Sequence, residues 1–328
     1  MKTYKFLLLI AQTLLISLVL GGCGGGSGSG SSGTKLLNLT PEKANQLAIS
    51  AASALPGCEY TSDTAIGGSP AVQSVGIIYK NALSKTIEDE HNRVSAQRAI
   101  DEKIDGNCPT NPGYYTKIGT HENGVENLTY NFVGYCVGDE NESTTITGKT
   151  YPKSVSTPTD NGPIFQYLQV ASGNVTVVEK SLDGTYTHTI SGKKVKYVDG
   201  NGGDANATES NPNKLVIDLF SIKDGRTGNT YSIKNADVSA YPSDDNVTSV
   251  TIIKNLTYTD SSTGSVTIKT GSPLVTDADG VITSGDIIVT GEDGTSMTMV
   301  SDPSVTNGFS VKVGEDLVGV MDCSELVD

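Results

Sequence analysis

The feature that most constrains the fold of this chain is a change of hydrophobic period at Cys108. Beyond that residue, apolar side chains recur at every second position, which is the period of a β-strand with one buried face. The clearest runs are Leu128-Tyr130-Phe132, Tyr186-His188-Ile190, Leu256-Tyr258, Val266-Ile268, Met297-Met299 and Phe309-Val311-Val313. Threonine, serine and lysine fill many of the intervening positions, so the strands are expected to form a sheet that is wet on one side.

Tight turns separate these runs. Asp-Gly and Asn-Gly pairs supply the positive φ that two-residue hairpins need. Such pairs begin at Asn123, Asn161, Asp183, Asp199, Asp224, Asp279, Asp293 and Asn307. We therefore predict a mainly β fold over residues 108–328, built from antiparallel hairpins in a meander. The pattern leaves an open curved sheet, a half-barrel and a sandwich as alternatives, and it has no strict repeat length that would indicate a solenoid.

Residues 40–107 have a different pattern and are predicted to form a smaller helical segment. Thr40 and Pro41 suit the N-cap and the first helical position. A second helical stretch is expected from about Val72 to Ile104, where apolar residues recur at roughly helical spacing, with Gly106 as its stop signal. This segment is a candidate to cover the apolar face of the sheet.

The first 23 residues have the layout of a secretory signal. Lys2 and Lys5 precede an apolar stretch of about 15 residues that ends at Leu20, which is short of the ~20 residues that a membrane-spanning helix needs. The stretch leads into Leu-Gly-Gly-Cys, which resembles the lipobox of bacterial lipoproteins. That resemblance implies a signal peptide at 1–22, cleavage before Cys23, and attachment of palmitate-like acyl chains to Cys23. Two or more such chains hold a protein on a membrane.

Residues 23–39 then comprise the lipidated cysteine and a Gly/Ser tether, whose ten most flexible residues reach roughly 18 Å. Gly24 after the cysteine resembles the state that is sorted to the outer membrane in enteric bacteria. Together with a Tyr-x-Phe-x-x-Tyr-Cys element at 130–136, the layout resembles uncharacterised β-rich envelope lipoproteins of Gram-negative, Campylobacter-like bacteria. We expect a lipid-anchored outer-membrane location, with the periplasmic and external faces both open as alternatives.

Four further cysteines suggest two disulfides in an exported protein. Cys108 and Cys136 flank a predicted hairpin and are the favoured pair, which leaves Cys58 to bridge to Cys323. A metal site is the rival interpretation, but the sequence has no C-x-x-C pair, and its histidines are scattered.

Asn-x-Ser/Thr sequons occur at seven positions, and three of them carry an acidic residue two places earlier. These three are Asn141, Asn206 and Asn246. They resemble the extended acceptor sequon of bacterial N-glycosylation in Campylobacter-like organisms, and each lies in a predicted exposed loop. We take them as N-glycosylation candidates.

The motifs of common chemistries are incomplete in this sequence. No G-x-S-x-G elbow occurs, and Ser191 to Lys194 fits S-x-x-K but falls on a predicted turn. The segment 277–280 resembles the start of a calcium loop, yet its later ligand positions hold Val281 and Ile282. We therefore assign no catalytic, metal-binding or cofactor-binding residue from the sequence.

The charge balance bears on partners. With 37 acidic against 23 basic residues the formal charge is -14, which disfavours nucleic acid as a partner. The leading interpretation is a membrane-anchored, non-catalytic protein whose surface binds an envelope protein or a glycan, or has a structural role. One alternative is a carrier of an apolar ligand in a half-barrel. A second is an exported hydrolase that uses carboxylates.

Overall fold

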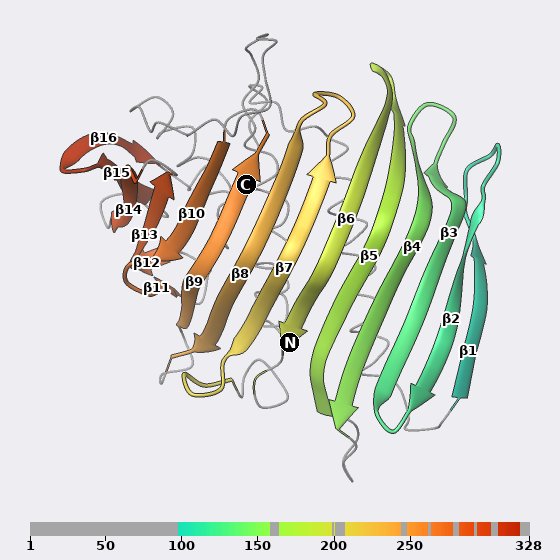
Figure 1. The fold of residues 1–328 in the computed structure, drawn as a ribbon, viewed down its shortest axis with the longest axis horizontal. Coiled ribbons are helices and arrows are strands. Elements are labelled where there is room, and N and C mark those ends of the chain that lie inside the picture. The colour runs from blue at the N-terminus through green and yellow to red at the C-terminus, as the bar shows by residue number, and fades with distance from the viewer. Residues whose placement is uncertain are drawn as a thin grey trace.

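The computed structural model describes residues 98–157, 164–198, 200, 207–243, 248–261, 264–277, 282–291, 294–302 and 308–321. Within these ranges the regular structure is entirely β-strand (Figure 1). The strands are β1 (Arg98–Asp105), β2 (Tyr114–Glu122), β3 (Val125–Gly138), β4 (Ser143–Thr157), β5 (Ile164–Ser181), β6 (Gly184–Val198), β7 (Asn213–Lys223), β8 (Thr230–Pro242), β9 (Ser249–Asp260), β10 (Gly264–Thr270), β11 (Leu274–Thr276), β12 (Ile282–Ser284), β13 (Asp286–Gly291), β14 (Ser296–Asp302), β15 (Gly308–Val313) and β16 (Asp316–Met321).

These strands form one antiparallel sheet in which nearly every strand pairs with its neighbours in the sequence. Figure 1 shows them side by side in chain order from β1 to β10. The sheet continues from β10 to β13 and ends at β16, while the short strands β11 and β12 pair off this path. The predicted mainly β meander is confirmed. Of the alternatives, a sandwich would need two packed sheets, whereas the described strands form a single open one.

The two faces of the sheet differ in burial. Along β7, for example, Leu215, Ile217, Phe220 and Ile222 are buried, and the residues between them are partly or fully exposed. The same face buries Ile233, among others, with no exposed surface. We call this the buried face and the opposite one the outer face. The predicted alternation of apolar and polar residues is therefore present in the sheet.

In four central strands, the alternation is interrupted at about the same position along the strand direction. Each has two consecutive residues on the outer face between two buried ones. These pairs are Lys193-Lys194 in β6, Asp218-Leu219 in β7, Lys234-Asn235 in β8 and Lys254-Asn255 in β9. Lys194 and Asn235 reach this arrangement through positive φ angles of 50° and 52°. These irregularities form a row across the four strands. Like a β-bulge, each one changes which residues of its strand point to the outer face.

The turn between β2 and β3 shows how the hairpins close. Asn123 and Gly124 are its two central residues, and their φ angles of 51° and 75° are both positive, as a type I′ turn requires. In the next such turn, between β5 and β6, the loop residues are Leu182 and Asp183, so Gly184 begins the strand. The Asp183-Gly184 pair therefore predicts a turn at the right place, although the two residues that form the turn lie one position earlier in the sequence.

The predicted helix at 72–104 is wrong in its last part. Arg98–Asp105 is strand β1, which pairs with β2 from Arg98 opposite His121 to Asp105 opposite Tyr114. Ile100 and Ile104 are four residues apart, a spacing that fits both a helix and one face of a strand. The β region therefore begins about ten residues before the predicted boundary at 108. The earlier residues of segment 40–107 lie outside the described ranges.

The turn predicted at Ser191-Gly192 is also wrong, because both residues lie within β6. The outward pair Lys193-Lys194 shifts the alternation there, so the even-numbered buried series ending at Gly192 is followed by an odd-numbered one starting at Val195.

The predicted bridge between Cys108 and Cys136 is confirmed, with Cα atoms 5.5 Å apart. Cys136 lies in β3 and Cys108 precedes β2, so the bridge ties the start of the β2–β3 hairpin to its end. Cys23, Cys58 and Cys323 lie outside the described residues, as do the signal segment 1–22 and the tether 23–39.

Candidate functional site

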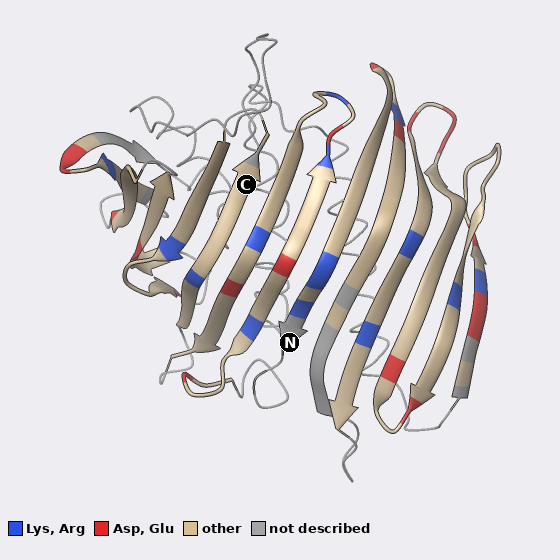
Figure 2. Cartoon of the chain, in the orientation of Figure 1, with Lys and Arg blue, Asp and Glu red and all other residues tan. Residues whose placement is uncertain are grey.

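Lysines cluster along the central strands of the sheet (Figure 2), and the burial pattern places them on the outer face. We define the lysine patch as Lys149 and Lys153 of β4, Lys193, Lys194 and Lys196 of β6, Lys214 of β7, Lys234 of β8 and Lys254 of β9. All of them are partly or fully exposed. Four come from the outward pairs, which place adjacent residues on one face where a regular strand would send them to opposite faces.

Among the residues that the structure describes, few acidic side chains share this patch. Asp218 lies 3.6 Å from the Lys194 ammonium, and Asp237 lies 4.0 Å from that of Lys254. Figure 2 shows the other acidic residues mostly at the turns and along β1. A chain of formal charge -14 thus presents a positively charged surface in the centre of its sheet.

The positive charges crowd one another at Lys196. Partial burial lowers the pKa of its ammonium group, and the nearby charges of Lys194 and Lys153 lower it further. Repulsion of this kind favours the binding of an anion, because a negative charge between the lysines would relieve it.

An exposed aromatic ring lies within the patch. Tyr151 is 45% exposed and belongs to β4, on the same face as Lys149 and Lys153. Hydrogen-bonding side chains adjoin these lysines, since Lys153 pairs with Gln169 of β5 and Lys149 pairs with Asn131 of β3. The patch therefore combines cations, amides and one aromatic surface.

A second group of charged residues is buried where the β5–β6 and β7–β8 turns meet. His188 has no exposed surface, and it lies between two carboxylates. Its Nδ1 atom is 3.2 Å from the Asp224 carboxylate and 3.1 Å from the Gly225 backbone nitrogen. Its Nε2 atom is 3.6 Å from the Glu179 carboxylate.

Arg226 lies between this buried group and the solvent. Its guanidinium donates to the Glu179 carboxylate at 2.9 Å and to Asp183 at 3.0 Å. It also stacks over the Tyr186 ring at 4.2 Å. Arg226 therefore joins the β7–β8 turn, on which it lies, to both strands of the β5–β6 hairpin.

The contacts of Asp224 explain its ionisation. Burial raises the pKa of its carboxyl, but hydrogen bonds from His188, the Arg226 N–H and the Thr227 hydroxyl outweigh burial and lower the pKa overall. A carboxylate held by three donors stays charged at neutral pH.

This arrangement favours structure over catalysis. Glu179 and Asp224 approach opposite nitrogens of one imidazole, so they do not converge on a common point as metal ligands must. His188 itself faces only protein atoms at both nitrogens. Across the described ranges, no group of three or more His, Cys, Asp or Glu side chains is arranged to hold a metal ion.

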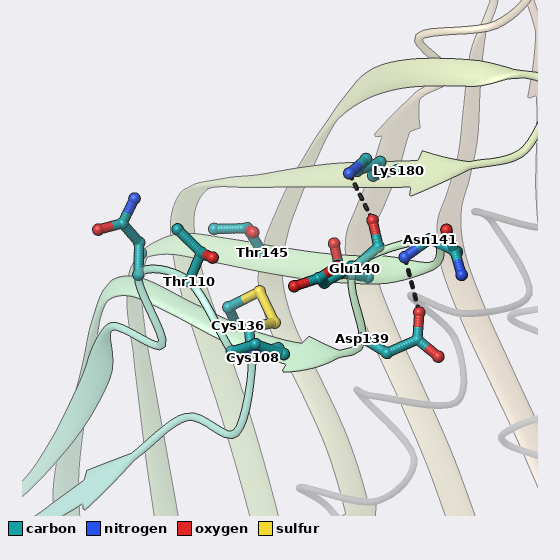
Figure 3. Close-up of a pocket in the computed structure, with 12 residues that line it drawn as sticks. Cys108, Thr110, Cys136, Asp139, Glu140, Asn141, Thr145 and Lys180 are labelled. Atoms are coloured by element: carbon teal, nitrogen blue, oxygen red, sulfur yellow. Dashed lines mark hydrogen bonds between the residues drawn. A yellow bond between two sulfur atoms is a disulfide. The ribbon is translucent and has the colours of Figure 1, made fainter.

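A polar pocket of about 690 Å³ lies beside the disulfide (Figure 3). Cys108 and Cys136 form one wall, and the β3–β4 turn forms another. Lys180 of β5 crosses toward this turn and donates to the Glu140 carbonyl at 2.5 Å. Charged, hydroxyl and amide side chains dominate the lining, which suits a hydrated polar group better than an apolar ligand.

One predicted glycosylation residue lies at this pocket. Asn141 is exposed in the β3–β4 turn, as its sequon predicted. The Asp139 carboxylate accepts hydrogen bonds from the N–H groups of Asn141 and Glu142, at 2.8 and 2.9 Å. These two bonds lower the pKa of Asp139. Asn206 and Asn246 lie outside the described residues.

The sequence contains a signal for the lysine patch but none for the buried group around His188. Ile-Lys-Asn occurs at 233–235 and again at 253–255, each time followed by an apolar residue. In a strand of period two, an apolar-polar-polar-apolar run indicates an irregularity that turns two polar residues outward. The contact between His188 and Asp224 joins residues 36 positions apart, and no sequence spacing indicates it.

Comparisons of this chain with family models, with curated proteins and with solved structures found no match. In the described part of the chain, no helix has the length and apolar character needed to span a membrane.

Proposed function

We propose that this protein is a lipid-anchored envelope lipoprotein that binds a partner through the outer face of its sheet and has no catalytic role. Cys23 would carry the acyl chains, and the Gly/Ser tether would leave the β region free to move near the outer membrane. The lipobox-like exit sequence supports the anchor.

The observation that supports the binding role is the cluster of lysines in the centre of the outer face. Among the described residues, the buried face is mainly apolar in the centre of the sheet, whereas the outer face there has eight lysines against two acidic residues. Strand-to-strand hydrogen bonding fixes the backbone beneath these lysines, so the charges occupy defined positions. Preorganised charge of this kind supports selective binding of an oppositely charged partner.

The two alternative functions gain less support. An apolar-ligand carrier needs a largely apolar cavity, whereas the pocket beside the disulfide is lined mainly by polar groups. A carboxylate hydrolase needs two carboxylates that reach a substrate. Glu179 and Asp224 are both buried, and His188 lies between them.

The anchor is tested in cells by comparing the full chain with its Cys23→Ser variant. We expect fatty-acid labelling of the original protein and its recovery with the outer membrane. The variant should lose the label and leave the membrane fraction. Unchanged fractionation and labelling of the variant would contradict the lipoprotein proposal. Protease treatment of intact cells would then show whether the sheet faces outward.

The binding role is tested by affinity capture from envelope extracts. The bait is the full chain, and the comparison is a variant in which Lys149, Lys193 and Lys234 are changed to glutamine. Envelope material that is captured by the original and lost by the variant supports the outer face as the binding surface. Equal capture by the two proteins would contradict it.

A further inference from the structure

The lysines of the outer face form bands that cross the strands. In one band, Lys193 of β6 pairs with Leu219 of β7, which pairs with Lys234 of β8. In a second band, Lys153 of β4 pairs with Gln169 of β5, which pairs with Lys196 of β6. Neighbouring strands lie about 4.8 Å apart, so lysines on alternate strands recur at about 9.6 Å along a line perpendicular to the strands.

We infer that the lysine patch binds a linear anionic polysaccharide whose chain lies across the strands of the sheet. The inference rests on the proposed function, since it takes the outer face to be the binding surface. It adds the chemical class of the partner: a glycan that carries carboxylate, sulfate or phosphate groups at repeated intervals.

The distribution of acidic residues favours a narrow linear partner over a flat one. Asp183 lies in the turn ten residues before Lys193, a separation of about 33 Å along β6. Glu142 lies seven residues before Lys149, or about 23 Å along β4. Both distances exceed the screening length of about 8–10 Å at physiological ionic strength. A polymer that crosses mid-strand therefore contacts the lysines and avoids the acidic turns, whereas an anionic bilayer laid on the whole face would meet both.

The side chains among the lysines favour a sugar polymer over a nucleic acid. Gln169, Asn131 and Asn255 offer amide groups for hydroxyl recognition beside the patch lysines. Tyr151 offers one exposed ring, flanked on the same strand by Lys149 and Lys153. Single-stranded nucleic acid is held by aromatic side chains on which successive bases stack, and among the side chains that the structure describes the patch has a single exposed ring, that of Tyr151.

The crowding of positive charge around Lys196 supports an anion at this place. Burial and two neighbouring ammonium groups lower the pKa of Lys196. An anionic group bound among Lys153, Lys194 and Lys196 would raise that pKa again, so binding at high pH should be accompanied by proton uptake.

The test uses the full chain bearing Cys23→Ser, so that acylation does not interfere. Binding is measured by calorimetry to dextran sulfate, alginate and uncharged dextran, over a series of salt concentrations. Vesicles of phosphatidylcholine with phosphatidylglycerol, and oligothymidylate, serve as the membrane and nucleic-acid probes. The patch variant changes Lys149, Lys193 and Lys234 to glutamine. A matched control changes three exposed lysines outside the patch, Lys103, Lys223 and Lys312, in the same way.

We expect binding to the two anionic polysaccharides and none to dextran. The patch variant should bind at least about tenfold more weakly, equivalent to about 1.4 kcal/mol, and its affinity should depend less steeply on salt. The control variant should stay within about twofold of the original. Tyr151→Ala should weaken binding about three- to tenfold without changing the salt dependence, because the ring carries no charge.

Three results would overturn the inference. The first is equal weakening in the patch and control variants. The second is vesicles or oligothymidylate binding as tightly as the polysaccharides, and the third is no binding to either anionic polysaccharide. None of these results bears on the anchor, because the test protein lacks Cys23 and the anchor is judged separately by fractionation.

Discussion

Removal of Arg226 should cost this protein a large part of its stability, although the residue lies in a turn. Its guanidinium contacts the Glu179 carboxylate at 2.9 Å, and the side chain of Glu179 is only 8% exposed. In an Arg226→Met variant, the buried Glu179 side chain loses its cationic partner. Breaking a buried ion pair from one side costs about 3–5 kcal/mol.

The structure places the expected loss at the lower end of that range. Arg226 is itself 17% exposed, so water reaches part of the site. Its second partner, Asp183, is 60% exposed, so solvent screens this pair and it adds little. The stacking on Tyr186 contributes about 0.5–1 kcal/mol. We therefore expect Arg226→Met to lower the free energy of unfolding by about 3 kcal/mol.

Urea unfolding followed by far-ultraviolet circular dichroism measures this loss, which corresponds to a fall in Tm of about 6–12 °C. Lys254→Met is the matched control. Its exposed pair with Asp237 at 4.0 Å should be worth about 0–1 kcal/mol. A double-mutant cycle with Glu179→Gln should give a coupling of at least about 1 kcal/mol. The reasoning is refuted if Arg226→Met loses no more stability than the control, or if the cycle shows no coupling.

Three further predictions concern stability and modification. Changing Cys108 and Cys136 together to serine should lower the unfolding free energy by about 3.6 kcal/mol, from the entropy of closing a loop of 28 residues; a loss below 1 kcal/mol in urea unfolding would contradict this. The folded-state pKa of Asp224 lies below its ordinary value of 3.8, so the stability that it contributes is present above about pH 4 and is lost as the pH falls through the folded value. Asp224→Asn should flatten the fall in stability measured by acid titration between about pH 4 and pH 2, and an unchanged acid profile would count against the hydrogen bonds described for Asp224. Native protein should carry a hexose-containing addition at Asn141 that Asn141→Gln removes from the intact mass, and identical masses after allowing for the substitution would exclude glycosylation there.

The fold was predictable from the sequence where the alternation is regular. Tyr186, His188 and Ile190 lie on one strand, as their spacing predicts, and the Asn123-Gly124 pair closes the hairpin that it indicates. The prediction failed where spacing is ambiguous. Ile100 and Ile104 fit a helix and a strand equally well, and only the long-range pairing of β1 with β2 distinguishes the two.

The functional features were less accessible to sequence reasoning. The charge balance of the chain indicates an acidic protein, but it averages over the lysines on one face and the acidic residues in the turns. Lys153 and Lys196 become neighbours of Gln169 only through the pairing of three strands. His188, Glu179 and Asp224 likewise meet only because β5, β6 and the β7–β8 turn adjoin. Among the site predictions, the Cys108–Cys136 bridge was accessible because both residues flank one hairpin.

The most direct test of the central claim is photo-crosslinking on the anchored protein in cells. A photoreactive residue replaces Tyr151 in the lysine patch or, as a control, Leu182, which is 84% exposed in the β5–β6 turn. The account predicts a carbohydrate-containing adduct from position 151 that disappears when Lys149, Lys193 and Lys234 are changed to glutamine. Position 182 should give little of it. Equal adducts from both positions, or an adduct at 151 that persists without the three lysines, would contradict the claim that the outer face is the binding surface.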